Sequence, residues 1–264
     1  MGLDQPLLAR YITWLKNFLH GNFGTSYSFK ISVNKLIAER LRPTLILTVS
    51  SCLIAILIAV PAGTIAAYRP YSLFDYSLSG ISFLGAAAPD FFIALIAIYF
   101  LGLKWDLLPT SGMHAAGDES VRSYIRYAIM PILVLSFRLL GSLTRQTRSA
   151  VLEVMSEDFI RTDRALGYSE PQVVMHALRN ALIPIVTNIG GMIPFCIGGS
   201  VVLENVFGWP GIGKLLVTSV TNRDYPVIVA VSTLIAVAVL GSNILVDFVF
   251  TLLDPRITHT QKSR

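Results

Sequence analysis

Three long stretches of this sequence carry no charged residue. They lie between Arg42 and Arg69, between Arg179 and Glu204, and between Asp224 and Asp247. Each is long enough for an α-helix of about 20 residues to cross the ~30 Å hydrocarbon core of a bilayer. Of the 264 residues, 53% are hydrophobic and only 14% are charged, whereas soluble domains have about 25% charged residues. This composition excludes a soluble enzyme or a disordered chain as the leading interpretation and indicates a membrane protein.

Two further apolar stretches contain a single charge each, Asp90 in one and Arg138 in the other. We therefore predict an all-α membrane protein with five visible transmembrane helices. Helices are the expected spanning form because alternation with a period of two is absent and because backbone groups in lipid must be hydrogen-bonded within the segment. The predicted transmembrane helices lie approximately at 43–67, 78–103, 127–144, 182–203 and 226–253.

Lysine and arginine are distributed unequally between the two sides that these helices define. The segments 68–75, 145–181 and 254–264 share one side and together hold nine of them. The loops 104–126 and 204–225 share the other side and hold five. By the positive-inside rule, the side with nine is cytoplasmic.

This orientation places residues 1–42 outside the cell membrane, as an extracytoplasmic segment with amphipathic helices, in front of a transmembrane domain at 43–264. The segment carries six lysines and arginines and has no leading hydrophobic stretch, so its translocation alone is unfavourable. We therefore expect a further transmembrane helix in front of Met1 that this chain lacks. Within residues 1–20, one helical face is apolar; it comprises Leu8, Tyr11, Ile12, Leu15 and Leu19.

The predicted cytoplasmic segment 145–181 is more than a connector, because ten of its 37 residues are charged while its apolar residues keep helical spacing. Gly167 interrupts this spacing and suits a helix C-cap. Ser169, Pro171 and Gln172 then predict a new helix, with Ser169 as N-cap and Gln172 completing a capping box. The segment therefore predicts a helix–glycine–helix unit at the cytoplasmic face. It is either a docking surface for a soluble partner or a solvated hairpin on the lipid surface.

The residues of this unit resemble the cytoplasmic "EAA" loop of binding-protein-dependent ABC importer permeases, most closely the dipeptide/oligopeptide/nickel branch. The resemblance is carried by Asp158–Gly167 and His176–Pro184, and Asp163 and Leu166 depart from it, because the pattern usually has alanine and often lysine there. Other stretches match this branch in the same order, so the resemblance covers essentially the whole chain. They are Gly2–Pro6, Gly24–Tyr27, Thr147–Val154, Glu204–Gly213, Arg223–Pro226 and Asp254–Ile257.

The resemblance implies a type I ABC importer permease fold, a helical bundle in the cytoplasmic (inner) membrane, and an import function for peptides of the di- or oligopeptide class. It implies four kinds of neighbour: a second homologous permease subunit, two cytosolic ATP-binding subunits, an extracytoplasmic solute-binding protein, and membrane lipid. ATP hydrolysis is expected in the partner ATPase, so the chain itself is not expected to be an enzyme. Dipeptides, longer peptides, nickel complexes and glutathione all remain open as solutes.

The resemblance also implies which residues couple the permease to its ATPase. They are Glu157, Asp158, Arg161, Thr162, Arg164, Ala165, Gly167, Ser169 and Glu170. Asp90 and Arg138 are separate candidates, because a charge in mid-membrane costs on the order of 3 kcal/mol and should face the bundle interior. They either line the solute pathway or form a structural ion pair, or Arg138 extends toward the cytoplasmic face.

No cofactor, metal site, catalytic arrangement or nucleic-acid partner is expected. The histidines and cysteines lack metal-ligand spacing, and no Gly-Lys-Ser/Thr phosphate-binding loop is present. Two other interpretations stay open on the sequence. One is a secondary carrier driven by an ion gradient, although such folds usually show internal repeats and the chain has no convincing repeat. The other is a truncated, non-functional permease.

Overall fold

The computed structural model describes residues 6–253, and this range consists of helices, turns and two isolated β-bridges. The predicted cytoplasmic segment 254–264 lies outside the described residues. The all-α prediction is confirmed for the described part of the chain. The helices are α1 (Leu7–Leu19), α2 (Val33–Tyr68), α3 (Leu73–Ala87), α4 (Asp90–Ala97), the π-helix η1 (Ile98–Lys104), α5 (Val121–Met155), α6 (Asp158–Ala165), α7 (Glu170–Val206), α8 (Ile212–Thr221) and α9 (Tyr225–Leu253).

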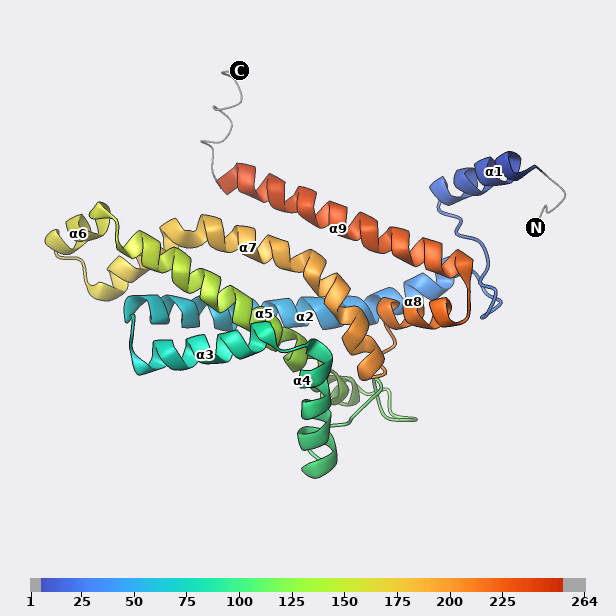
Figure 1. Cartoon of the computed structure of the whole chain (residues 1–264), viewed down its shortest axis with the longest axis horizontal. Coiled ribbons are helices and arrows are strands. Elements are labelled where there is room, and N and C mark those ends of the chain that lie inside the picture. Colours follow the sequence, from blue (N-terminus) through green and yellow to red (C-terminus); the bar gives the residue numbers. More distant parts are fainter. Residues whose placement is uncertain (1–5, 254–264) are drawn as a thin grey trace, which may run out of the picture.

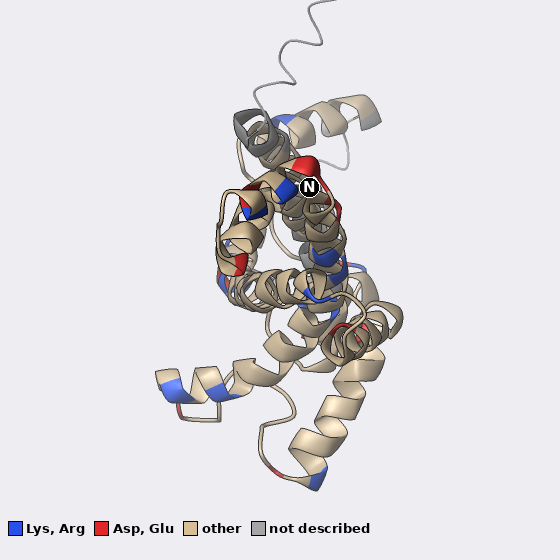
Figure 2. Ribbon diagram, turned by 90° about the vertical axis from the view of Figure 1, so that its left-hand side faces the viewer, with Lys and Arg blue, Asp and Glu red and all other residues tan. Residues whose placement is uncertain are grey.

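Four long helices set the shape of the molecule. Figure 1 shows α2, α5, α7 and α9 running along the long axis, with α6 at one end and α1 and α8 at the other. We call these the α6 end and the α8 end. α5 packs against α2, α3 and α7, and α9 packs against α7 and α8. Figure 2 looks onto the α6 end, where charged residues of both signs gather on the nearest helices.

The outer surface of the long helices is apolar. On α2, Leu45, Val49, Leu53 and Leu57 recur every four residues and are between 50% and 71% exposed. A contiguous apolar stripe of this kind is unfavourable in water and is the surface that lipid tails cover. Four helical segments of the described chain are long and apolar enough to cross a membrane: Val33–Tyr68, Val121–Met155, Glu170–Met192 and Tyr225–Val246. They contain the predicted helices at 43–67 and 127–144 and overlap those at 182–203 and 226–253.

The predicted helix at 78–103 is wrong as a single helix. The structure breaks it into α3 and α4–η1, which meet at an angle of 107°. Ala88 is extended, with φ −77° and ψ 135°, because Pro89 disfavours helical backbone in the residue before it and cannot donate to the helix. Asp90 consequently lies in the first turn of a new helix, where a negative charge is favourable.

The helices that flank the predicted loop 145–181 are longer than expected. α5 continues to Met155, and α7 begins at Glu170, so most of this segment extends two transmembrane helices. Only α6 and two short breaks lie between them. The helix–glycine–helix unit therefore consists of α6, Gly167 and the first turns of α7.

The loop between α7 and α8 is fastened to α2 by buried polar groups. Glu204 is fully buried; its carboxylate accepts hydrogen bonds from the Thr44 hydroxyl (2.7 Å) and from the backbone amide of Lys214 (3.0 Å). The indole of Trp209 donates to the carbonyl of Pro43 at 3.0 Å. These contacts hold the start of α8 against α2 and close the α8 end of the bundle.

α3 and α5 approach each other at backbone distance. Gly85 of α3 faces the carbonyl oxygen of Phe137 on α5, and a Cβ atom at Gly85 would lie 2.9 Å from that oxygen. Gly141 of α5 similarly faces the backbone of α3 at Ser82. Small residues allow such close helix contacts within a membrane, so α3 lies along α5 with little freedom to shift.

We expect Gly85→Ala to destabilise the protein by about 1–3 kcal/mol, because the added methyl group overpacks the crossing of α3 and α5. The matched control is Gly80→Ala in the same helix, where nothing lies within 4 Å of the added atom. This control should leave the apparent melting temperature in detergent unchanged or slightly higher. Equal melting temperatures for the two variants would contradict the close packing.

Candidate functional site

α6 is a short helix held to the end of the bundle by its apolar side. Ser156 and Glu157 separate it from α5. Ile160 is fully buried and belongs to the main hydrophobic cluster, which also contains Val173 at the start of α7, and the half-buried Phe159 packs against this cluster. The position of α6 is therefore fixed by both helices that it joins.

The turn from α6 to α7 follows the sequence prediction. Gly167 has a φ of +84°, a backbone conformation that glycine adopts without the strain of a side chain. Ser169 is the N-cap of α7, and Gln172 Oε1 accepts hydrogen bonds from the Ser169 amide (2.9 Å) and hydroxyl (2.8 Å). Pro171 lies in the first turn of α7. The capping box and the glycine turn are confirmed.

Two polar side-chain contacts cross the turn. Arg164 forms a bidentate ion pair with Glu170, at 3.0 Å from Nε to Oε1 and 3.3 Å from Nη2 to Oε2. Asp163 Oδ2 lies 2.8 Å from His176 Nδ1, which brings α6 against the second turn of α7. Together they fix the angle between α6 and α7.

The remaining predicted coupling residues lie on the solvent side of this unit. Arg161 and Asp158 are 83% and 97% exposed in their side chains and only 3.8 Å apart, an exposed pair that contributes little to stability. Of the nine residues predicted for this surface, Glu170 alone is partly buried. The exposed ones are Glu157, Asp158, Arg161, Thr162, Arg164, Ala165, Gly167 and Ser169.

Asp90 and Arg138 lie together, away from α6. Arg138 Nη1 is 3.0 Å from Asp90 Oδ2, and the Asp90 side chain is 9% exposed while that of Arg138 is 35% exposed. The pair joins the first turn of α4 to the middle of α5, directly after the break that Pro89 makes. The ion-pair alternative thus describes the observed geometry.

A second ion pair, which the sequence did not reveal, joins α3 and α5 nearer the α6 end. Arg148 of α5 binds Asp75 of α3 through both carboxylate oxygens, at 2.5 Å from Nε and 2.7 Å from Nη2. Asp75 is 2% exposed and also accepts from the backbone amide of Tyr71 at 2.9 Å. The partners lie 73 residues apart in sequence, so no local pattern could have paired them.

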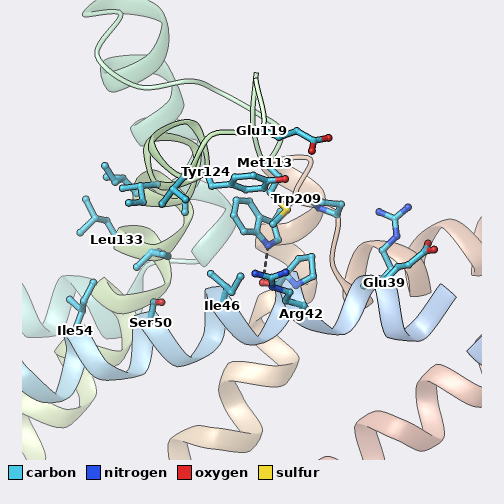
Figure 3. A pocket seen from close by; sticks show the side chains of 18 residues that line it. Glu39, Arg42, Ile46, Ser50, Ile54, Met113, Glu119, Tyr124, Leu133 and Trp209 are labelled. Atoms are coloured by element: carbon cyan, nitrogen blue, oxygen red, sulfur yellow. Dashed lines mark hydrogen bonds between the residues drawn. The ribbon is translucent and has the colours of Figure 1, made fainter. Parts of the chain in front are cut away.

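A cavity of about 830 Å³ lies between α2 and α5, toward the α8 end. Figure 3 shows Ile46 and Ser50 of α2 on one wall, Tyr124 of α5 on the other, and Trp209 beside them. Most of the lining is apolar, and the charged residues are Glu39, Arg40, Arg42 and Glu119. The predicted pathway residues Asp90 and Arg138 are not part of this lining. Among the described residues, no group of three or more His, Cys, Asp or Glu side chains is placed to hold a metal ion.

Comparison with known proteins decides the family. The family model described as "Binding-protein-dependent transport system inner membrane component" matches residues 59–259. The chain belongs to this family. It is therefore a multi-pass membrane protein and a permease subunit of an ABC importer, as the resemblance implied. Membership in this family also excludes the alternative interpretation of the chain as a secondary carrier.

Two curated relatives of this permease are similar over almost its whole length. It is 43% identical over 261 residues to the oligopeptide transport system permease protein AppB of Bacillus subtilis (strain 168), covering 98% of this chain and 83% of that protein. It is 38% identical over 260 residues to the probable peptide ABC transporter permease protein y4tP of Sinorhizobium fredii (strain NBRC 101917 / NGR234), with coverage of 98% and 83%.

The fold of the permease is found in a solved structure. A chain of the inward-facing MetNI methionine ABC transporter superposes with a TM-score of 0.67 at 19% identity, covering 83% of this permease and 96% of that chain. At this identity the likeness concerns the fold alone. The predicted type I importer permease fold is confirmed.

At the α8 end of the permease, Asp224 fastens the segment before α2 to the start of α9. Its carboxylate accepts hydrogen bonds from the Ser26 hydroxyl and from the backbone amides of Tyr27 (3.0 Å) and Ser28 (3.1 Å). Asp224 is fully buried. Burial opposes ionisation, but these hydrogen bonds outweigh it and hold the pKa of Asp224 below its ordinary value.

We expect Asp224→Asn to destabilise the permease by about 2 kcal/mol at neutral pH, because a charged hydrogen-bond acceptor is lost from a buried site. A lowered folded pKa means that this contribution is present above the unfolded carboxyl pKa of about 3.9. It is lost as the pH falls through the folded pKa. Thermal unfolding in detergent across this range measures the difference between variant and wild type.

Asp106→Asn, in the exposed loop before α5, is the control and should change stability little at neutral pH. If Asp224→Asn and the wild type unfold equally at neutral pH, or differ by the same amount below the folded pKa, the role assigned to Asp224 is wrong.

Proposed function

We propose that this permease imports peptides across the cytoplasmic membrane, taking them from an extracytoplasmic solute-binding protein and using work that cytosolic ATPase subunits deliver through α6. It acts in this proposal with a second homologous permease subunit and two ATP-binding subunits. The observation that carries the proposal is the geometry of α6. This helix is fixed to two long helices by apolar contacts and to α7 by the Arg164–Glu170 and Asp163–His176 contacts, and its charged surface is exposed.

The surface of α6 favours docking of a soluble protein over a hairpin lying on lipid. Two of its exposed side chains, Asp158 and Arg161, are charged. Leu166 is 71% exposed at the end of the helix, which adds an apolar contact where this branch often has lysine. Asp163 departs from the usual alanine, but its carboxylate is engaged by His176 within the permease. The departure therefore stiffens the unit and leaves the docking surface unchanged.

Peptides are the proposed solutes because the two curated relatives are named for oligopeptide and peptide transport. The orientation rests on the positive-inside rule, which puts the α6 end in the cytoplasm and the α8 end outside. The solute-binding protein then docks at the α8 end, where the loop between α7 and α8 is fastened to α2 through Glu204 and Trp209.

The work received at α6 passes into the membrane through α5. α5 is one continuous helix from the loop before it to Met155, and it is tied to α3 by Asp75–Arg148 and to α4 by Asp90–Arg138. Close backbone packing of Gly141 against Ser82 lies between the two ion pairs. We call these contacts the brace of α5 and assign Asp90 and Arg138 to it. The brace makes α3 and the start of α4 follow any displacement of α5.

Insertion of Gly-Ser directly after Gly167 is expected to abolish ATP-coupled peptide uptake while leaving membrane insertion intact. The inserted pair moves Glu170 and His176 of α7 away from their partners on α6. α6 then loses the contacts that fix its angle, so it no longer passes a displacement to α5 as a rigid unit. The measurement is peptide uptake and peptide-stimulated ATP hydrolysis in proteoliposomes that contain the permease with its partner subunits.

The same insertion after Gly117 is the control, because Gly117 also has a positive φ (+79°) and nothing lies within 4 Å of a Cβ atom added there. It should leave uptake unchanged. Undiminished uptake after insertion at Gly167 would refute the coupling role, and solute movement by the permease without any ATPase would refute the proposed function as a whole. Coupled uptake of a non-peptide solute, with no response to peptides, would refute the substrate class alone.

Asp75→Asn is expected to uncouple the permease. ATP hydrolysis should persist, whereas the peptide moved per ATP should fall roughly two- to thirty-fold, the range in which mutations along a coupling network act. The reversed pair Asp75→Arg with Arg148→Asp should recover part of the loss. If hydrolysis, uptake and the amount of folded protein fall together, Asp75 acts on stability alone and the brace is refuted.

A further inference from the structure

α1 is an amphipathic helix with a sharply divided surface. At 3.6 residues per turn its apolar residues fall on one side and its polar residues on the other. The polar side carries Thr13, Lys16 and Asn17. The apolar side includes Leu8, Tyr11, Ile12, Trp14, Leu15, Phe18 and Leu19.

Most of this apolar side is not covered by the permease. Leu8 and Leu19 are 71% and 76% exposed, Tyr11 and Ile12 are each 56% exposed, and Trp14 is 43% exposed. A contiguous apolar surface of this size on a helix marks a binding face. Its occupant must be apolar where the helix is apolar and aqueous where the helix is polar.

The attachment of α1 fixes its height relative to the bundle. The rings of Phe18 and Phe23 lie with centroids 4.8 Å apart, and both rings pack against the apolar cluster of α2, α8 and α9. The next segment is held by Asp224, one residue before α9 begins. Figure 1 shows α1 at the α8 end, beside the start of α9. α1 is therefore tied to the level at which a transmembrane helix starts, which is the surface of the bilayer.

The residue types of α1 match that surface. Tyr11, Trp14 and Phe18 follow one another with ring centroids 5.8 and 5.2 Å apart, and tryptophan and tyrosine are enriched at membrane–water interfaces. The sequence of the helix contains Arg10 and Lys16 and no acidic residue. A basic helix with an aromatic and aliphatic face is complementary to anionic phospholipid.

We infer that α1 is an interfacial helix whose apolar face is inserted into the lipid leaflet at the α8 end, with its positive charge among anionic phospholipid headgroups. The inference needs only the membrane location of the permease. It does not depend on the identity of the solute or on which side of the membrane is cytoplasmic.

Spin labels at neighbouring positions test it in the complete importer, reconstituted in nanodiscs that contain phosphatidylglycerol. Ile12→Cys places the label on the apolar side of α1, and Thr13→Cys places the matched control on the polar side. Cys52 and Cys196 are replaced by serine in both variants, and peptide-stimulated ATP hydrolysis confirms that the background functions. Power-saturation spectra then give the accessibility of each label to oxygen, which concentrates in lipid, and to a water-soluble nickel complex.

The expected result is a several-fold higher ratio of oxygen to nickel accessibility at position 12 than at position 13. In nanodiscs of phosphatidylcholine alone, the ratio at position 12 should fall. Two results at position 12 would overturn the inference. High nickel accessibility would place α1 in water, and an immobilised label shielded from both reagents would identify a protein as the occupant. An unchanged ratio in the neutral lipid would overturn the role of anionic headgroups.

Discussion

The structure depends on charged side chains that are paired between neighbouring helices of the bundle. α5 is 35 residues long, about 52 Å at 1.5 Å per residue, whereas the hydrocarbon core is about 30 Å thick. A helix of this length crosses the bilayer and still extends to α6. Its Arg138 and Arg148 each have an acidic partner on α3 or α4. Removing one member of such a pair would leave its partner partly buried without a compensating charge, so the pairs fix the positions of α3 and of the start of α4 along α5.

The two ends of the bundle are stabilised in different ways. At the α8 end, the buried carboxylates of Glu204 and Asp224 accept hydrogen bonds from backbone amides of neighbouring segments. Such contacts lock loops in place. At the α6 end the charged pairs are more exposed, and the conformation is set by backbone chemistry at Gly167 and Ser169 and by burial of Ile160. The first arrangement gives a rigid closure, and the second gives a defined shape with an available surface.

What the sequence predicted correctly is what short-range chemistry determines. The charge-free stretches located the long helices, and the residues from Gly167 to Gln172 predicted the turn and the capping box, because each of these signals acts within a few residues. The break at Pro89 is also local, but a helix in a membrane tolerates proline as a kink, so the residue alone does not distinguish a kink from a 107° turn. Asp163–His176 and Asp75–Arg148 depend on how helices meet in space. Spacing along the chain contains no information about those contacts.

The continuity of α5 into the segment before α6 has a geometric consequence. Each residue of an α-helix turns the chain by about 100° and advances it by 1.5 Å. Because Arg148 is fixed to α3 and Met155 ends the helix, the number of residues between them sets the direction in which α6 points around the α5 axis. A deletion or insertion of one residue there would swing the surface of Asp158 and Arg161 through more than a quarter of a circle. The number of residues in this short interval therefore determines the rotational orientation of α6 about the α5 axis.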